Sequence, residues 1–381
     1  MRTMQPSIML GSYVWAQDRL PIDEFQLRVD DVRQHMSRNA WKGLLVYGDA
    51  REHAALAYLT NFIPRMRWGM ALFARDGEPR LLCSMSTRDI PAMRTMTWIA
   101  DVRSGWEWDK AFDPWFERFD GEALGLGTIG FDRMALTLSQ SVRRSLGERF
   151  TLQRVDDLLN IPRSAKRPRE LSAMRRSCEV LNAAANTFVA SWRQNQAPET
   201  AALAAERTAR AMAAQDVRAL VSVDGGRNLL PFQGRFEAVA KPLAGYLAVK
   251  VAGYWADLFV TAGMHAAPVA RQAEAALDAL VTAVRPGVAA ADLHQRTIAA
   301  LRPYTLHPIL SGSVGHGIGL SLHEGPEFGD GCPASLVEDG IYSLQVGLAD
   351  PPSNHILISA IVRATAKGAE VLARSPSALA S

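Results

Sequence analysis

The chain has 381 residues, 48% of them hydrophobic and 21% charged, and its 42 Lys and Arg against 39 Asp and Glu leave a net charge of +3. This length predicts two domains of ordinary size, and the composition is that of a soluble globular protein. The balanced charge gives no reason to expect nucleic acid or an anionic membrane as a partner, and no stretch approaches the roughly 20 apolar residues of a membrane span.

The first part of the chain alternates between helical and strand-like patterns. Spacing of apolar residues predicts helices over 24–40, 51–59, 108–118 and 137–147. Short apolar runs predict strands at 43–47, 70–74, 80–83 and 129–131, and Asp76-Gly77 suits a tight turn between two of them. This alternation predicts an α/β domain, which we place at residues 1–158.

A proline-containing, basic linker at 156–168 leads into the second part of the chain. Helical patterns follow at 170–194, 198–214, 268–284 and 289–302, and strand-like runs at 219–223, 245–251, 257–260, 306–310, 341–348 and 355–363. We therefore expect an α+β domain over residues 159–381. Its small, polar tail, Ser375–Ser381, is expected to fray.

Cysteine usage bears on the compartment. Cys83, Cys178 and Cys332 are scattered, odd in number and without CxxC spacing. This pattern favours reduced, mostly buried thiols. With no small-residue cleavage signal after the first residues, we expect a cytoplasmic protein.

The most informative segment is Gly315–Pro326, with the sequence GHGIGLSLHEGP. His316 and His323 are seven residues apart and would lie on opposite faces of a straight strand. The glycines between them permit a bend that brings both imidazoles into one cleft. The segment resembles the signature of the creatinase/prolidase/methionine aminopeptidase (pita-bread) family, in which a GHGIG-type turn precedes a HExP histidine.

Further segments support this resemblance along nearly the whole chain. Residues 253–257 (GYWAD) resemble the family's GYxSD strand, residues 57–62 (AYLTNF) its YLTGF stretch, and residues 163–176 its entry into the catalytic domain. The resemblance implies an α/β N-terminal domain and a C-terminal pita-bread α+β domain, usually assembled as a homodimer.

The chain departs from the family at the metal ligands. Family metalloenzymes hold two divalent ions with two Asp, one His and two Glu. Asp257 and His316 match two of these ligands, whereas Tyr246, Gln345 and Ser359 stand in place of three carboxylates. Two ions about 3.5–4 Å apart need bridging carboxylates to offset their repulsion. A phenol and an amide are poor substitutes, so we predict no metal and no other cofactor.

Several residues remain able to support catalysis. We predict His316 and His323 as general acid or base, because histidine titrates near neutral pH. Asp257 would orient an imidazole or hold a cationic part of the substrate, and Glu324 would fix the tautomer of His323 or act as an acid. The predicted substrate-binding residues are Tyr246, Tyr254, Gln345 and His355, with Phe62 and Arg65 on a loop that in creatinase-like dimers reaches the neighbouring subunit's site.

A structural role stays open for most of these residues. The two histidines would then be hydrogen-bonding groups, Glu324 a cap or ion-pair partner, Tyr246 part of the core and Arg65 a solvated charge. The histidine that activates water in creatinase would lie near residues 229–232, where this chain has none. The chain is therefore not expected to be creatinase itself.

These observations lead to one main functional hypothesis. The chain is predicted to be a metal-independent, creatinase-like hydrolase or lyase that acts on a C–N bond of a small amidine, amide or amino-acid-derived substrate. One alternative is a catalytically silent pita-bread domain that binds a peptide or small ligand. Another is an Xaa-Pro-type metallopeptidase with an unusual mononuclear site.

Overall fold

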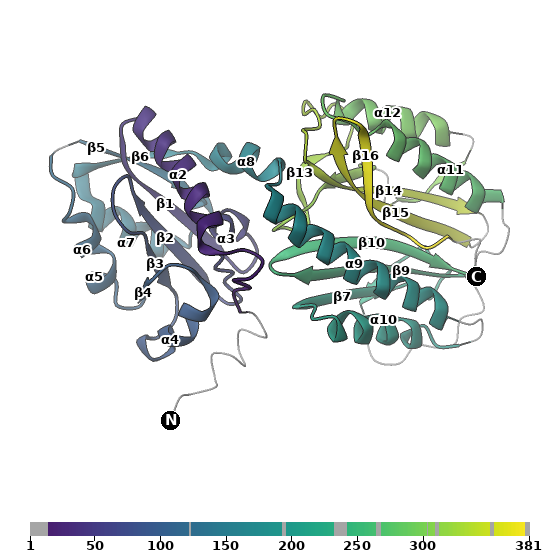
Figure 1. The fold of residues 1–381 in the computed structure, drawn as a ribbon, viewed down its shortest axis with the longest axis horizontal. Helices are drawn as coiled ribbons and strands as arrows, with labels where there is room; N and C mark the ends of the chain where they lie inside the picture. Colours follow the sequence, from purple (N-terminus) through teal and green to yellow (C-terminus); the bar gives the residue numbers. More distant parts are fainter. Residues whose placement is uncertain are drawn as a thin grey trace. The chain divides into compact units, whose positions relative to one another are not determined.

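The computed structural model describes residues 14–121, 123–192, 196–231, 242–263, 268–302, 304–308, 312–350 and 354–377. It divides into two compact units, Met1–Ile161 and Pro162–Ser381, each described here by itself (Figure 1). Predicted residues 193, 194, 232, 309, 310 and 378–381 lie outside the described residues. Within the described ranges, no helix is both long and apolar enough to cross a membrane.

The first unit is built on a six-stranded mixed sheet with the order β4-β3-β2-β1-β5-β6. β1 pairs antiparallel with β2 and parallel with β5, so the chain passes through the sheet centre before extending it on both sides. The strands are β1 Trp41–Asp49, β2 Trp68–Ala74, β3 Arg80–Cys83, β4 Asp101–Ser104, β5 Leu124–Ile129 and β6 Phe150–Arg154.

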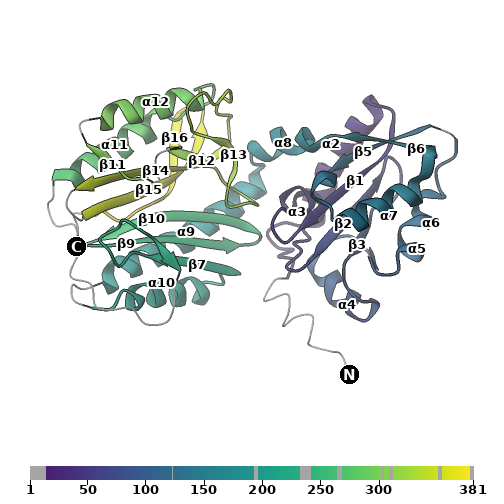
Figure 2. The same ribbon diagram turned by 180° about the vertical axis from the view of Figure 1, so that it is seen from behind.

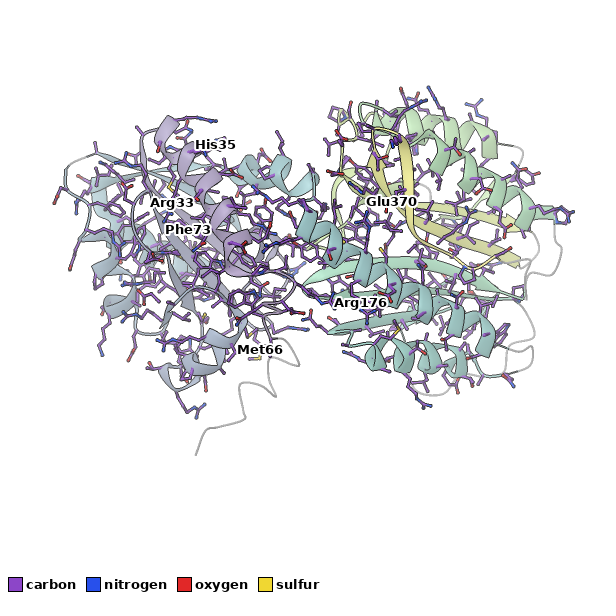
Figure 3. All side chains as sticks on the ribbon, viewed as in Figure 1. Arg33, His35, Met66, Phe73, Arg176 and Glu370 are labelled. Carbon is purple, nitrogen blue, oxygen red and sulfur yellow. The ribbon has the colours of Figure 1, made fainter. Side chains whose placement is uncertain are left out.

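Helices cover both faces of this sheet (Figures 1 and 2). Leu45 and Leu72 face a core formed with Trp115 and its neighbours on one side. Leu44 and Phe73, opposite each other in the β1–β2 ladder, therefore point to the other side, which α2 and α3 cover (Figure 3). The helices are α2 Ile22–Arg38, α3 Ala54–Thr60, α4 Ile90–Met93, α5 Trp108–Ala111, α6 Asp113–Phe116 and α7 Leu136–Leu146.

Several features of the first unit differ from the sequence-based prediction, among them β5, which was predicted at 129–131 and spans Leu124–Ile129. The helix predicted over 108–118 is two single-turn helices, α5 and α6, and Pro114 stands in the first turn of the second. Proline cannot donate the backbone hydrogen bond that a continuous helix needs there. The edge strands β4 and β6 were not predicted, because they are short and largely polar.

The second unit contains two sheets. One has the order β10-β9-β7-β8; the other has the order β13-β12-β14-β15-β16, with β11 added to β14. The strands are β7 Asp216–Val221, β8 Leu230–Pro231, β9 Leu243–Val251, β10 Tyr254–Ala262, β11 Thr305–Leu306, β12 Gly315–Gly317, β13 Glu324–Glu327, β14 Ile341–Asp350, β15 Asn354–Thr365 and β16 Gly368–Arg374.

Helices cover the outer face of each of these two sheets (Figure 1). α9 (Pro168–Ser191) and α10 (Glu199–Ala211) cover the first sheet, and α11 (Pro268–Ala283) and α12 (Ala290–Leu301) cover the second. The short helix α8 (Asn160–Ser164) precedes them. Leu344, Val346 and Leu348 of β14 pack in the core beneath α11. The alternate residues Ser343 and Gln345 therefore face inward, toward the first sheet.

Hydroxyl groups join the inward faces of the two sheets. Ser359 of β15 accepts a hydrogen bond from the backbone N–H of Phe259 in β10 at 2.8 Å, and Thr261 of β10 donates to the carbonyl of Leu357 at 2.9 Å. Ser375 donates to the carbonyl of Phe259 and accepts from the N–H of Ser359. Ser375, predicted to belong to a frayed tail, is thus buried and bridges both sheets.

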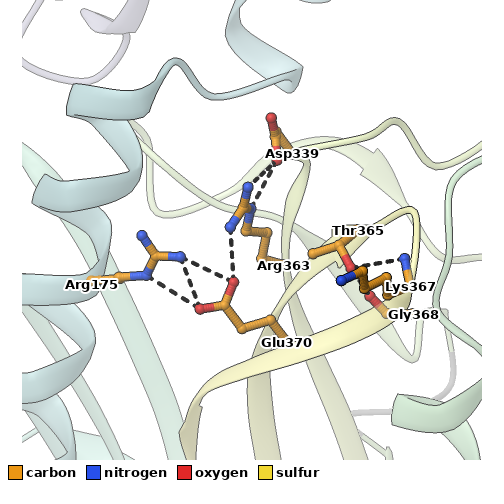
Figure 4. A network of polar contacts seen from close by, with 7 residues as sticks. All are labelled: Arg175, Asp339, Arg363, Thr365, Lys367, Gly368 and Glu370. Atoms are coloured by element: carbon orange, nitrogen blue, oxygen red, sulfur yellow. Dashed lines mark hydrogen bonds and ion pairs between the residues drawn. The ribbon is translucent and has the colours of Figure 1, made fainter.

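Ion pairs connect α9 to the second sheet. Glu370 of β16 accepts hydrogen bonds from Arg175 of α9 and Arg363 of β15, and Arg363 also donates to Asp339 (Figure 4). The arrangement of helices outside and facing sheets inside confirms the predicted fold class, an α/β unit followed by an α+β pita-bread unit.

Candidate functional site

Asp257 and Tyr246 form a hydrogen-bonded pair on the inward face of the first sheet. Tyr246 lies opposite Phe259, and Asp257 is two residues before Phe259 in β10, so strand alternation puts all three on one face. Tyr246 Oη donates to Asp257 Oδ2 at 2.9 Å. Burial, and then the negative charge of Asp257, raises the pKa of Tyr246 well above its ordinary value. The phenol therefore keeps its proton and acts as the donor.

His316 of β12 approaches the same carboxylate. Its Nε2 lies 3.8 Å from Asp257 Oδ2, and its Nδ1 lies 2.9 Å from the carbonyl oxygen of Gly317. Since a carbonyl only accepts, Nδ1 must carry the hydrogen, and in the neutral ring Nε2 presents its lone pair. Asp257 is 1% exposed and His316 3%. His316 Nε2 and Asp257 Oδ1 make no hydrogen bond with the described residues.

The glycines beside His316 are required by the close approach of neighbouring strands. A Cβ atom on Gly315 would lie 2.5 Å from the carbonyl oxygen of Ser343, and one on Gly317 would collide with the backbone of Gly325. Neither glycine has a positive φ. Their role is therefore to let β12 lie close to its neighbours.

His323 stacks on His316. The two ring centroids are 3.8 Å apart and the ring planes differ by 17°. The predicted proximity of these imidazoles is thus present, but stacked rings cannot donate in-plane hydrogen bonds to each other. His323 as a whole residue is exposed. Partial burial of the ring, and then the adjacent His316, lowers the pKa of His323.

The second sheet adds neutral polar groups to this face. Ser343 lies opposite His316 in the β12–β14 ladder, and Gln345 lies opposite Ser359 in the β14–β15 ladder. Ser343 is 1% exposed, and its hydroxyl makes no hydrogen bond with the described residues. Ser343 was not among the predicted site residues, although its place two residues before Gln345 in one strand indicates the same face.

Glu324 belongs to an ion-pair cluster. Arg163 Nη2 lies 2.5 Å from its Oε1, and Lys166 Nζ lies 3.2 Å from its Oε2. Burial alone would raise the pKa of Glu324, but the charges of Arg163 and Lys166 lower it to about 2. The carboxylate is therefore ionised near neutral pH and cannot supply a proton. This geometry corresponds to the ion-pairing alternative rather than to an acid catalyst.

Tyr254 and His355 are placed away from the Asp257–His316 pair. Tyr254 is three residues before Asp257, so it points to the opposite face of β10, where it donates to Glu170 of α9 at 2.9 Å. The prediction of Tyr254 as a substrate-binding residue is thus corrected. His355 is four residues from Ser359, about 13 Å along β15. There its ring lies 5.1 Å from that of His307.

Phe62 and Arg65 belong to the first unit. Phe62 is 2% exposed, and a Cβ atom on Gly69 would lie 2.9 Å from its ring. Its ring is therefore core and not an available wall for a ligand, which corrects that prediction. Arg65 is half-buried. Its predicted role beside a partner subunit stays a prediction.

The model of metallopeptidase family M24 matches residues 172–366, slightly more than half of the chain. The chain belongs to metallopeptidase family M24. This membership confirms the pita-bread resemblance and supports hydrolysis of a C–N bond as the general class of reaction. No curated protein matches this family member significantly.

Solved structures with the same fold include three named peptidases. An X-Pro aminopeptidase from Thermotoga maritima MSB8 is 18% identical, with a TM-score of 0.76 over 92% of this chain and 99% of that one. A prolidase from Pyrococcus horikoshii OT3 is 17% identical, with a TM-score of 0.75 over 93% and 99%. Dipeptidase PepE from Mycobacterium ulcerans is 20% identical, with a TM-score of 0.74 over 94% and 97%.

The side chains of this M24 member do not fit the two-metal centre that the family implies. Among the described residues, no three His, Cys, Asp or Glu side chains are grouped so as to hold an ion. At the matching positions, Tyr246 donates its proton to Asp257, and the Ser359 hydroxyl is occupied by the N–H of Phe259. The parallel rings of His316 and His323 cannot both direct an in-plane lone pair at one ion.

Proposed function

We propose that this M24 member hydrolyses a C–N bond in a small amidine, amide or amino-acid-derived substrate, using side chains in place of two metal ions. The observation that carries the proposal is the buried His316–Asp257 pair. His316 Nε2 presents a lone pair beside a carboxylate, and neither Nε2 nor Asp257 Oδ1 is bonded to the described residues. Leaving two such atoms unpaired in a core is costly, so binding a ligand is their best-supported role.

The proposed reaction assigns one task to each side chain. His316 Nε2 takes a proton from water while the water oxygen attacks the substrate carbon and forms a tetrahedral adduct. Asp257, 3.8 Å away, stabilises the imidazolium that forms. The same proton then passes from His316 to the nitrogen as the C–N bond breaks, which returns neutral histidine.

His323 has a supporting role in this scheme. Its ring holds the His316 imidazole in place by stacking, and the residue is exposed. Burial and the adjacent His316 lower the pKa of His323, which disfavours a second positive charge beside the imidazolium that forms. Gln345 and Ser343 provide neutral hydrogen-bonding groups on the same face.

A second candidate is an Xaa-Pro-type metallopeptidase with one metal ion. The named activities of the Thermotoga and Pyrococcus proteins favour it, and Asp257 and His316 are two residues able to bind an ion. It requires an ion held by two protein ligands, fewer than the three that catalytic zinc sites use. For this reason we rank it second.

The deciding experiment compares the full-length protein with its His316→Ala variant. Amide, amidine and Xaa-Pro dipeptide substrates are assayed with a chelator and then with added manganese, cobalt or zinc. We expect turnover that the chelator does not change and that falls about 100-fold or more in His316→Ala. His294→Ala, which removes a half-buried imidazole from α12, is the matched control and should retain full turnover.

Other outcomes decide between the candidates. Cleavage of Xaa-Pro dipeptides that stops with chelator and returns with metal would establish the mononuclear peptidase. Binding of the substrates without turnover under any condition would identify a catalytically silent binding domain. Equal turnover by His316→Ala and the natural protein would remove His316 from the mechanism.

A further inference from the structure

Arg218 lies on the same sheet face as Asp257, although it is on a different strand. Arg218 of β7 is opposite Ala248 of β9, and Ala248 is opposite Asp257 of β10. Residues opposite each other in antiparallel ladders share a face, so all three point inward. β7 and β10 are separated by two strand spacings, which places the two backbones about 10 Å apart.

Trp255 positions the guanidinium of Arg218. The Arg218 guanidinium carbon lies 4.6 Å from the centroid of the Trp255 ring, within the range of a cation–π contact. Trp255 is 4% exposed, and its backbone N–H donates to the carbonyl of Gly319 at 2.7 Å. Gly319 belongs to the segment between His316 and His323. The residue whose ring contacts Arg218 is therefore hydrogen-bonded through its backbone to the segment between the two imidazoles.

The positive charge of Arg218 is not neutralised within the described part of the chain. Arg218 is exposed and forms no ion pair or hydrogen bond with the described residues. The nearest acidic side chain on this face by register, Asp216, lies opposite Lys250. Lys250 is buried, with its Nζ 5.1 Å from the same tryptophan ring. A carboxylate can therefore approach Arg218 without displacing a protein partner.

The inward face thus has two ends of opposite character. At Asp257 and His316 it offers hydrogen-bond acceptors, Oδ1 and Nε2, which suit the N–H groups of a substrate. At Arg218 it offers a planar donor that suits a carboxylate. We infer that Arg218 is a specificity-determining residue that binds the carboxylate of an N-acyl amino acid or similar amide. The inference rests on the proposed function for the position of the scissile bond at His316.

The test measures binding separately from turnover. N-acetylglycine and its uncharged analogue N-acetylglycinamide are titrated into the full-length protein by calorimetry. We expect the carboxylate to bind about tenfold more tightly than the amide, equivalent to 1.4 kcal/mol. Arg218→Met, which keeps an aliphatic chain over Trp255, should abolish this preference without changing the affinity for the amide.

Matched variants show whether charge or folding is responsible. Arg218→Lys should restore part of the preference, and Arg296→Met, which removes an exposed cation from α12, should leave it intact. The inference is overturned if Arg218→Met still prefers the carboxylate, if the natural protein binds both probes equally, or if it binds neither. His316→Ala should keep the preference for the carboxylate. The binding preference at Arg218 can therefore be present even if the protein proves not to hydrolyse these substrates.

Discussion

Two groups of buried polar side chains in the second unit are bonded in different ways. In the first group, one carboxylate oxygen of Glu324 forms an ion pair with Arg163 and the other forms an ion pair with Lys166. In the second group, Asp257 Oδ2 accepts a hydrogen bond from Tyr246. Asp257 Oδ1 and His316 Nε2 make no hydrogen bond with the described residues. The first group is complete without a ligand and the second is not.

This difference separates a structural role from a functional one. A fully paired buried charge is held by its partners and loses stability when one of them is removed. A buried atom left unpaired is a cost that a native fold retains at few places, often at functional sites. His323 and Glu324 are consecutive in the chain, so the motif alone does not distinguish the two roles.

The largest expected effect is on stability at Glu324. Glu324→Gln removes the carboxylate that pairs directly with Arg163 and Lys166, and of these two cations only Arg163 has a further carboxylate, Glu170, near it among the described residues. We expect the free energy of unfolding to fall by about 3–5 kcal/mol. Urea-induced unfolding of the full chain, followed by tryptophan fluorescence, measures this change.

Glu370→Gln is the matched control for that experiment. Glu370 is also paired with two cations, Arg175 and Arg363 (Figure 4), but its side chain is 38% exposed. Exposed ion pairs are screened by water, so the loss should not exceed about 1 kcal/mol. If the two variants lose equal stability, burial is not what distinguishes the Glu324 cluster.

The next effect is on acid stability. The pKa of Glu324 is lowered from 4.5 to about 2, so its stabilising contribution is complete above pH 4.5 and is lost as the pH falls toward 2. At about 1.4 kcal/mol per pH unit, the loss amounts to about 3 kcal/mol. Unfolding free energies measured at several pH values in this window should fall less steeply for Glu324→Gln. Parallel curves would contradict the assignment.

Much of the fold could be predicted from apolar patterns. The strands β9, β10, β14 and β15 are long and largely apolar because both faces of their sheets are covered. Helices cover the outer face of each sheet, and the inner face of each lies against the other sheet. The missed β16 has an exposed Val371 and few buried residues, as an edge strand can have. Ser375 was missed because its hydroxyl bonds to backbone atoms of Phe259 and Ser359, which are 116 and 16 residues away in the chain.

The site could be predicted only in part. The GHGIG-type motif identified His316 and the GYWAD segment identified Asp257, because both residues belong to contiguous signatures. Arg218 could not be found in this way, since its position beside Asp257 depends on which strands pair and in which register. Tyr254 is a different case. Its odd spacing from Asp257 in one strand already placed it on the other face.

The smallest expected change in stability is at Asp257, where the change in activity is large. Asp257→Asn retains an oxygen that accepts from Tyr246 and removes a buried charge whose second oxygen is unpaired. We expect the free energy of unfolding to stay within about 1 kcal/mol of the natural value or to rise, because removing an incompletely paired carboxylate also removes its desolvation cost. Turnover should fall about 100-fold or more, because the imidazolium of His316 loses the charge that stabilises it.

Urea unfolding and steady-state kinetics on one preparation measure both quantities. A destabilisation comparable to that of Glu324→Gln, with turnover retained, would show that Asp257 is structural and that the two groups do not differ in role.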